Sequence, residues 1–243
     1  MSKPFLILQL RPEDETADNE LEAILYYGGL STRQSVRRRV EQEGLTGIDL
    51  DDYAGIIVGG SPFDISTPQE QKTETQRSVE AGFQVLLGQI EERDFPFLGC
   101  CSGNGLLGSY CGAAISKRYG EAVGGTDIFL TAEGKLDPLL AGLPESFRVL
   151  VGHKEACDTV PPGCTLLAGN ESCPVQMFRL KENIYATQFH PEGDAAGFIV
   201  RINAYRNHGY FPPEKAESLI RAIAGENTPE AQLILKRFVE RYR

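Results

Sequence analysis

Short apolar runs alternate with helical patterns in the first half of the chain. Residues 4–10, 54–58 and 95–100 are apolar runs of strand length. Apolar positions of the intervening segments recur at helical spacing, at Leu21, Ile24 and Leu25 and at Val79, Phe83, Leu86 and Ile90. Strands that are apolar throughout are typical of parallel sheets covered on both faces. The alternation predicts an α/β fold: a flavodoxin-like, open, mainly parallel central sheet with helices on both faces.

Two further segments carry helix signals. Val36 and Val40, one helical turn apart, predict a short helix bearing the basic residues Arg33, Arg37, Arg38 and Arg39. We expect its basic face to be solvated, with docking of an anionic partner as the alternative. Thr67-Pro68-Gln69-Glu70 resembles a helix start, with a threonine cap, a proline in the first turn and a glutamate at the third position.

The pattern changes after residue 115. Short strands are predicted at 127–131, 147–151, 164–168, 175–179 and 184–188, which adds a small antiparallel region. Thr228-Pro229-Glu230 then marks the start of a helix with Ile234, Phe238 and Tyr242 on one face. We therefore expect a single domain over residues 1–243, with a C-terminal helical extension over about 194–243.

Composition narrows the function classes. The chain has 243 residues, 41% of them hydrophobic, and a net charge of −10. Such an acidic surface repels nucleic acids and anionic membranes, so neither partner is expected. The apolar run Phe5–Leu8 is too short for an export signal, which predicts a cytoplasmic protein with reduced cysteines. Cys157, Cys164 and Cys173 lack metal-knuckle spacing, and we predict no metal site and no cofactor.

Two signatures overlap in residues 95–113. The first, residues 103–108, reads GNGLLG and has the form of a dinucleotide fingerprint. A complete fingerprint needs a strand–helix–strand unit and an acidic residue about 20 positions on. Glu121 lies near that distance, but residues 116–120 are too polar for a buried strand. Dinucleotide binding is therefore an alternative that rests on this motif alone.

The second signature centres on Cys101. A nucleophile at a strand-to-helix elbow needs small residues two positions before and after it, and these are Gly99 and Gly103. The same rule places Leu98 and Ser102 around Cys100, so Cys100 is expected to face the core. The helix N-terminus would favour a Cys101 thiolate, and the Ser102 N–H would point toward an oxyanion. From this segment alone, a structural cysteine pair fits equally well.

A distant segment supplies a second group. Residues 184–192 read IYATQFHPE, a strand followed by His190, Pro191 and Glu192. His190 is suited to act as a base toward Cys101 and then as an acid toward a leaving amine, with Glu192 orienting the imidazole. The predicted carboxyl end of a strand is where open α/β sheets place their sites. Together the two segments favour the catalytic interpretation.

These motifs resemble the class I glutamine amidotransferases, in particular the amidotransferase domain of GMP synthase. The matching segments are Gly99–Gly103, Gly59–Pro62, Gly152–Lys154, Cys173–Gln176 and Gln188–Glu192. The resemblance implies a triad of Cys101, His190 and Glu192, and oxyanion donors at Gly60 and Ser102. It also implies substrate contacts at Gly59, Gly105, Gly152, His153 and Lys154. Residues 152–154 form a loop that is expected to contact the substrate through its backbone and not through the imidazole of His153.

The implied reaction is hydrolysis of the glutamine side-chain amide through a γ-glutamyl thioester, with ammonia passed to a synthetase partner. No ATP-binding motif occurs in this chain. The family pattern G-x-C-x-G-x-Q has Gly105 in place of its glutamine, and Asn104 precedes it. We expect the missing side chain to leave room beside the thiol. Two alternatives follow: a γ-glutamyl peptidase, and a non-catalytic binding module that keeps the fold.

Overall fold

The computed structural model describes residues 3–208 and 211–243. The strands of the central sheet are β1 (Phe5–Gln9), β2 (Ser35–Arg39), β3 (Gly55–Val58), β4 (Phe97–Cys100), β6 (Glu121–Leu130), β7 (Ser146–His153), β9 (Cys164–Gly169), β10 (Met177–Leu180) and β11 (Ile184–Thr187). A separate antiparallel pair consists of β5 (Ile115–Ser116) and β8 (Ala156–Cys157). The α-helices are α1 (Asp14–Gly28), α2 (Val40–Glu43), α3 (Glu74–Arg93), α4 (Ser102–Tyr110), α5 (Ala132–Leu136), α6 (Ala195–Ala204), α7 (Ala216–Ile223) and α8 (Pro229–Tyr242).

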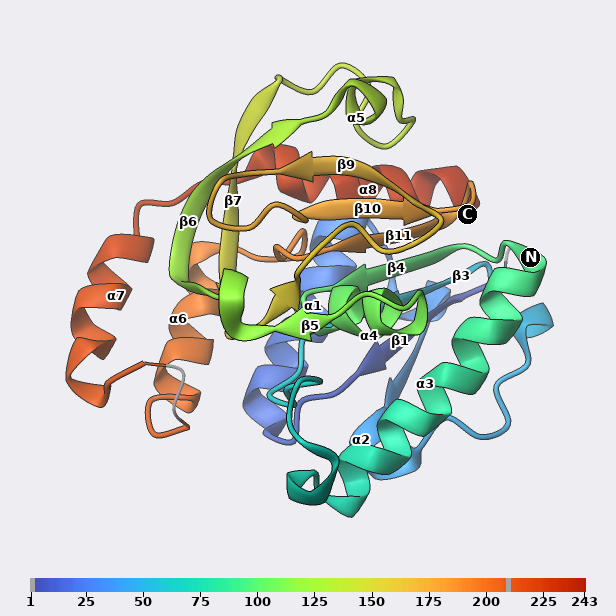
Figure 1. The fold of residues 1–243 in the computed structure, drawn as a ribbon, viewed down its shortest axis with the longest axis horizontal. Helices are drawn as coiled ribbons and strands as arrows, with labels where there is room; N and C mark the ends of the chain where they lie inside the picture. Colours follow the sequence, from blue (N-terminus) through green and yellow to red (C-terminus); the bar gives the residue numbers. More distant parts are fainter. Residues whose placement is uncertain (1–2, 209–210) are drawn as a thin grey trace.

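The central sheet is open and mixed, as Figure 1 shows. Its strand order is β2-β1-β3-β4-β11-β10-β9-β6-β7. The first five strands in this order pair in parallel, and the remaining four pair in antiparallel fashion. The predicted fold class is therefore confirmed.

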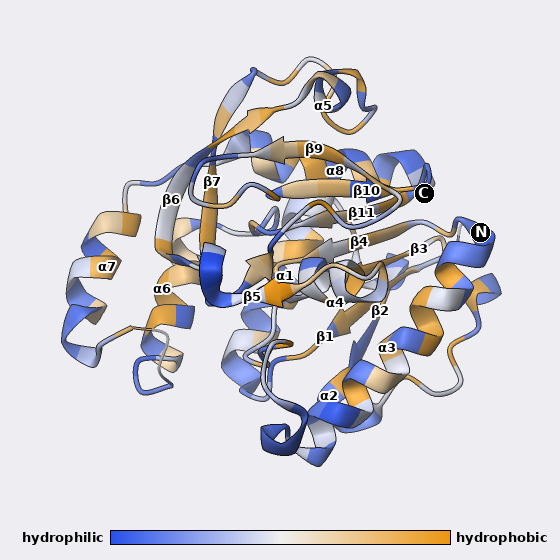
Figure 2. Ribbon diagram, viewed as in Figure 1, coloured by the Kyte–Doolittle hydropathy of each residue, from blue (hydrophilic) through white to orange (hydrophobic). Residues whose placement is uncertain are grey.

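Alternate side chains of the parallel strands enter two separate cores. Phe5 and Ile7 of β1 pack on one face, in a cluster that includes residues of α1 and α8. Leu6 and Leu8 face the other way, toward α3 and α4. In Figure 2 the inner strands are hydrophobic, while the helices carry hydrophilic residues along their lengths. Burial on both faces explains why these strands are continuous apolar runs in the sequence.

The predicted basic helix around Val36 is wrong. Residues 35–39 form β2, the edge strand beside β1, and the helix α2 that begins at Val40 has only four residues. Two valines at helical spacing are a weak helix signal, and backbone hydrogen bonds to β1 stabilise the strand conformation instead. The arginines do not form one solvated face, because Arg37 pairs with Asp18 at 2.7 Å and Arg39 with Asp14 at 2.9 Å. Charged side chains of this kind also protect an edge strand from pairing with another chain.

One predicted helix start is displaced and another is confirmed. Residues 69–71 form only a 3-10 turn, and α3 begins after Thr73, whose Oγ1 accepts from the Gln76 N–H at 3.1 Å. Thr73 therefore caps the helix in place of Thr67. At the other end of the chain, Pro229 is the first residue of α8 and Thr228 precedes it, as predicted.

The parallel strands end at one edge of the sheet. Gly59 follows β3, Cys101 follows β4, and the segment leading to His190 follows β11. Helices α6 and α7 pack on the antiparallel part of the sheet, where Phe198, Ile202 and Ile223 cluster with Leu150 of β7. Within residues 3–208 and 211–243, every helix is too short or too polar to cross a bilayer.

Candidate active site

Cys101 occupies a strained turn between β4 and α4. Its backbone has φ 54° and ψ −98°, a region that residues other than glycine rarely adopt. Such a conformation costs about 1–3 kcal/mol and persists only where the surroundings enforce it. The Cys101 N–H donates to the Thr187 carbonyl at 2.8 Å, which ties the turn to β11. The elbow predicted around Cys101 is therefore present.

The frame of small residues around this turn is also required. A Cβ on Gly99 would lie 2.7 Å from the backbone carbon and oxygen of Gly103, where neither atom can move. Cys100 is the last residue of β4 and only 1% exposed, in the core as predicted. Burial raises the pKa of the Cys100 thiol well above its ordinary value. Cys101, at 9% exposure, is the cysteine of this pair that reaches the cavities.

His190 and Glu192 form a buried hydrogen-bonded pair. His190 Nδ1 lies 2.7 Å from Glu192 Oε1, and His190 and Cys101 line the same cavity. Burial by itself would lower the pKa of His190, but the Glu192 carboxylate and Cys101 outweigh burial and raise the pKa to about 9. Burial would raise the pKa of Glu192, yet His190 and Arg201 hold that pKa well below its usual range. The arrangement favours an imidazolium beside the sulfur.

Arg201 of α6 is a member of this cluster that the sequence did not single out. Its Nη2 donates to Glu192 Oε1 at 3.1 Å, and its Nη1 lies 3.1 Å from His190 Nδ1. The helix α6 that carries Arg201 is fixed at its start by Asp194, whose Oδ1 accepts from the Gly197 N–H at 2.7 Å. The sequence signal that could have led to Arg201 is Asp194, a residue type that often caps helices, seven positions before it.

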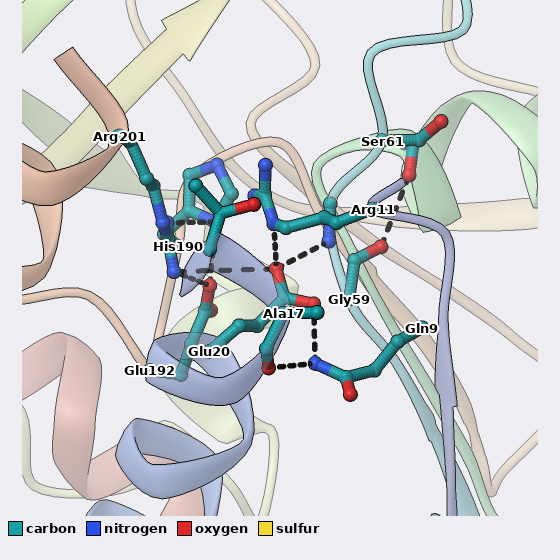
Figure 3. A network of polar contacts seen from close by, with 12 residues as sticks. Gln9, Arg11, Ala17, Glu20, Gly59, Ser61, His190, Glu192 and Arg201 are labelled. Atoms are coloured by element: carbon teal, nitrogen blue, oxygen red, sulfur yellow. Dashed lines mark hydrogen bonds and ion pairs between the residues drawn. The ribbon is translucent and has the colours of Figure 1, made fainter. Parts of the chain in front are cut away.

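Glu20 and Arg11 form a second buried pair beside the triad candidates (Figure 3). Arg11 Nε donates to Glu20 Oε2 at 2.6 Å, and Arg11 Nη1 donates to the Tyr205 hydroxyl at 3.2 Å. Burial would lower the pKa of Arg11, but Glu20 and Tyr205 raise it above its ordinary value. Arg201 Nη2 also lies 4.0 Å from Glu20 Oε2, so the two ion pairs form one network. Neither Arg11 nor Glu20 was predicted.

The predicted oxyanion donors lie near each other. The Ser102 hydroxyl donates to the Gly59 carbonyl at 3.0 Å, which joins the loop after β3 to the start of α4. Ser102 is the first residue of α4, so its N–H has no intrahelical acceptor. The Gly60 N–H donates to Glu20 Oε2 at 3.0 Å. The Gly60 N–H therefore already has an acceptor, which an incoming oxyanion would have to replace.

The predicted substrate contacts divide into two groups. Gly105, Gly152, His153 and Lys154 line one cavity together with Cys101. Gly59 does not line this cavity, and a Cβ there would overlap the Glu20 carboxylate. Close packing against Glu20 therefore explains why position 59 is a glycine.

The space expected beside Gly105 is partly filled. A Cβ on Gly105 would lie 2.9 Å from Ile65 Cδ1, so Ile65 occupies the position where a longer side chain would begin. Ile65 therefore takes up part of the room expected there, while Gly105 still lines the cavity that Cys101 reaches. The loop that carries Ile65 is held by Glu155, whose carboxylate accepts from the Ile65 and Ser66 N–H groups at 2.6 and 2.8 Å.

The glycines of GNGLLG are explained by packing. A Cβ on Gly103 would touch Val58, one on Gly105 would touch Ile65, and one on Gly108 would overlap the Cys157 sulfur. The chain after α4 enters β5, which pairs antiparallel with β8 and lies outside the central sheet. The strand–helix–strand unit that a dinucleotide fingerprint requires is therefore missing at this position.

Both ring nitrogens of His153 are engaged. Nε2 lies 2.9 Å from Glu121 Oε2, and Nδ1 lies 3.0 Å from the Glu155 carbonyl oxygen. Glu121 and Cys173 bring potential ligand atoms within 4.8 Å of this histidine, the one such group found among the described residues. The Glu121 carboxylate also accepts from Gln176 Nε2 at 2.6 Å, so hydrogen bonds explain the cluster. These contacts hold the imidazole of His153 between the Glu121 carboxylate and the backbone at Glu155.

Comparisons with known proteins point to one family. The sequence profile of the family "Glutamine amidotransferase class-I" matches residues 17–197. The chain is 30% identical over 186 residues to the glutamine-hydrolyzing GMP synthase of Caldicellulosiruptor saccharolyticus, covering 72% of this chain and 33% of that protein. It is 29% identical over 140 residues to a glutamine-hydrolyzing GMP synthase subunit of Pyrococcus abyssi, covering 57% of this chain and 66% of the relative. The chain thus spans only about a third of the full-length bacterial synthase.

Solved structures share the fold. A glutamine amidotransferase from Thermotoga maritima superposes with a TM-score of 0.73 at 20% identity, covering 99% of this chain and 100% of that chain. A glutamine amidotransferase from Methylobacillus flagellatus gives a TM-score of 0.70 at 16% identity, with coverage of 100% and 96%. On the profile match, which takes in most of the chain, this protein belongs to the class I glutamine amidotransferase family.

Proposed function

We propose that this protein is a cysteine amidohydrolase that cleaves the side-chain amide of glutamine, or of a related γ-glutamyl compound, through a γ-glutamyl thioester. The observation that carries the proposal is that Cys101, at a strained elbow, shares one cavity wall with His190 of the buried His190–Glu192 pair. A structural cysteine has no need of a strained backbone, an imidazole in the same cavity and a carboxylate that orients the imidazole.

Acylation begins with the Cys101 thiolate. Its sulfur attacks the amide carbonyl carbon, and the carbonyl electron pair moves to oxygen. When the tetrahedral intermediate collapses, the carbon–nitrogen bond breaks, and the His190 imidazolium donates its proton to the leaving nitrogen. Glu192 keeps the imidazole in the orientation that this transfer needs. The products are a γ-glutamyl thioester on Cys101 and a free amine, which is ammonia when the substrate is glutamine.

Deacylation reverses the roles. The neutral imidazole of His190 takes a proton from water, the oxygen attacks the thioester carbon, and the carbon–sulfur bond breaks to release glutamate and the thiolate. The Ser102 N–H at the start of α4 is the first donor for the oxyanion in both steps. The Gly60 N–H would be the second, once the oxyanion replaces the Glu20 carboxylate as its acceptor.

A synthetase partner would use the ammonia. The Pyrococcus abyssi relative is named as one subunit of a glutamine-hydrolyzing GMP synthase. We propose by analogy that ammonia released from glutamine by this chain passes to a separate synthetase protein.

The test is labelling and turnover with matched cysteine variants. Purified protein should release glutamate from glutamine or a γ-glutamyl amide, and a glutamine-like chloroketone should modify Cys101. Cys101→Ala should abolish both signals, whereas Cys100→Ala, a change in the adjacent core residue, should retain both. Equal loss in the two variants would overturn the assignment of the nucleophile.

A non-catalytic binding module is the competing function. The hydrogen bond from Gly60 to Glu20 favours it, because that N–H is already occupied. Absence of any hydrolysis or labelling in the folded wild-type protein would select this alternative. Hydrolysis that depends on Cys101 excludes it.

A further inference from the structure

Two cavities meet at Cys101. One, the amine-side pocket, is lined by Arg11, His190, Phe198, Tyr205 and Phe211, and encloses about 450 Å³ of empty space counting its mouth. The other, the acyl-side pocket, is the cavity that includes Gly105 and Lys154, at about 370 Å³. Cys101 belongs to both walls. A substrate attacked by this sulfur can therefore extend in two directions.

The position of His190 assigns the two directions. His190 lines the amine-side pocket and is absent from the wall of the acyl-side pocket. In the proposed reaction its imidazolium protonates the leaving nitrogen, so that nitrogen must lie on the amine side of the sulfur. Of these two cavities, Ser102, whose N–H is the first oxyanion donor in the proposed reaction, lines only the acyl-side pocket. The glutamyl group therefore belongs in the acyl-side pocket.

The amine-side pocket is open at its mouth, and its inner wall is mostly apolar. Its walls include the aromatic rings of Phe198 and Tyr205, both almost fully buried. Such walls fit an apolar group attached to the leaving nitrogen.

The charges on the wall are all of one sign apart from the nucleophile. Arg11, Arg201 and His190 line the amine-side pocket, whereas Glu20 and Glu192, the carboxylates that pair with them, are fully buried behind the wall. The Arg11 guanidinium lies directly over Gly60, since a Cβ there would overlap Arg11 Nη2, and Arg11 shares the wall of the pocket with Cys101. A guanidinium at the wall of an apolar pocket is a recognition group for a carboxylate.

We infer that the amine-side pocket binds an amino acid residue with a free carboxylate, so that the substrates are γ-glutamyl dipeptides. This inference rests on the proposed function. Attack of the Cys101 sulfur forms the thioester and breaks the γ-glutamyl carbon–nitrogen bond, and His190 supplies the proton with which the amino acid leaves. Water then hydrolyses the thioester, so the net reaction adds one water to give glutamate and one free amino acid.

The first test varies only the substrate. Wild-type protein is assayed with glutamine, γ-glutamyl-phenylalanine and γ-glutamyl-phenylalaninamide, which lacks the carboxylate. The dipeptide should exceed glutamine in kcat/KM by about tenfold or more, and the carboxamide should lose about tenfold relative to the dipeptide. Equal values for the dipeptide and its carboxamide, or a preference for glutamine, would overturn the inference.

The second test narrows the pocket from a rim position. Val123 of β6 lines the amine-side pocket and is partly exposed, so Val123→Phe should be tolerated in folding. Its ratio of dipeptide to glutamine kcat/KM should fall by about tenfold or more, whereas Val85→Phe on the exposed side of α3 should leave the ratio unchanged. An unchanged ratio in Val123→Phe contradicts the assigned pocket. If one of these contradicting results is found while glutamine is hydrolysed and Cys101 is labelled, only this inference fails. If none of the substrates is hydrolysed and Cys101 is not labelled, the proposed function fails as well.

Discussion

The backbone N–H of Gly60 donates to Glu20 Oε2 at 3.0 Å, so helix α1 and the loop after β3 are joined by a buried charge. The same carboxylate oxygen accepts from Arg11 Nε at 2.6 Å. Glu20 thus fixes the position of the loop beside Cys101 and also balances the charge of Arg11. Because both Glu20 and Arg11 are buried, removing either one should lower the free energy of unfolding.

Glu20→Gln should lower the free energy of unfolding by about 3 kcal/mol, because Arg11 would keep its buried charge without a counter-ion. Chemical denaturation followed by circular dichroism measures this change. Glu22→Gln on the exposed side of α1 is the matched control, and it should change stability by less than about 0.5 kcal/mol. A loss of similar size in both variants would contradict a special role for the Glu20–Arg11 pair.

Gly99→Ala should destabilise the elbow by about 1–3 kcal/mol, because the new methyl group would meet backbone atoms of Gly103 at 2.7 Å. Thermal unfolding measures the effect. The control is Gly88→Ala inside α3, where the nearest atom to the added Cβ lies 3.9 Å away. Since alanine is the better helix former, Gly88→Ala should gain about 0.5–1 kcal/mol. A tolerated Gly99→Ala would mean that the turn does not need its glycine frame.

The two charged neighbours of His190 should shift its titration in opposite directions. Glu192 raises the pKa of His190 toward about 9, and Arg201 lowers it. Glu192→Gln should therefore move the alkaline limb of the kcat/KM–pH profile to lower pH, and Arg201→Gln should move it to higher pH. A merely structural role for Arg201 would reduce activity without an upward shift of this limb.

The raised pKa of His190 also predicts how the stability of the fold depends on pH. Because the folded-state pKa of His190 lies above the ordinary 6.5, its interactions with Glu192 and Cys101 stabilise the fold fully below pH 6.5. This contribution is lost as the pH rises through about 9. Glu192→Gln should flatten that decline in denaturation experiments between pH 6.5 and 9, and a profile identical to wild type would contradict the coupling.

Much of the fold was determined by local pattern. The buried parallel strands, the stripe of α3 and the start of α8 follow from apolar periodicity and capping residues, which act between near neighbours. The elbow at Cys101 was also predictable, because its steric rule involves only residues 99–103. By contrast, the two valines near β2 did not reveal that the segment would complete a sheet edge beside β1.

The surroundings of the site were decided by tertiary structure alone. Glu20, Arg11 and Arg201 come from separate segments, and each one is polar at a position where a surface role was equally consistent with the sequence. Likewise, Ile65 takes up part of the space beside Gly105 although 40 positions (105 − 65) separate them in the chain. A sequence specifies the chemistry of each side chain and its short-range geometry. Which distant charges share one buried volume depends on how strands and helices pack, and that is settled only when the whole chain has folded.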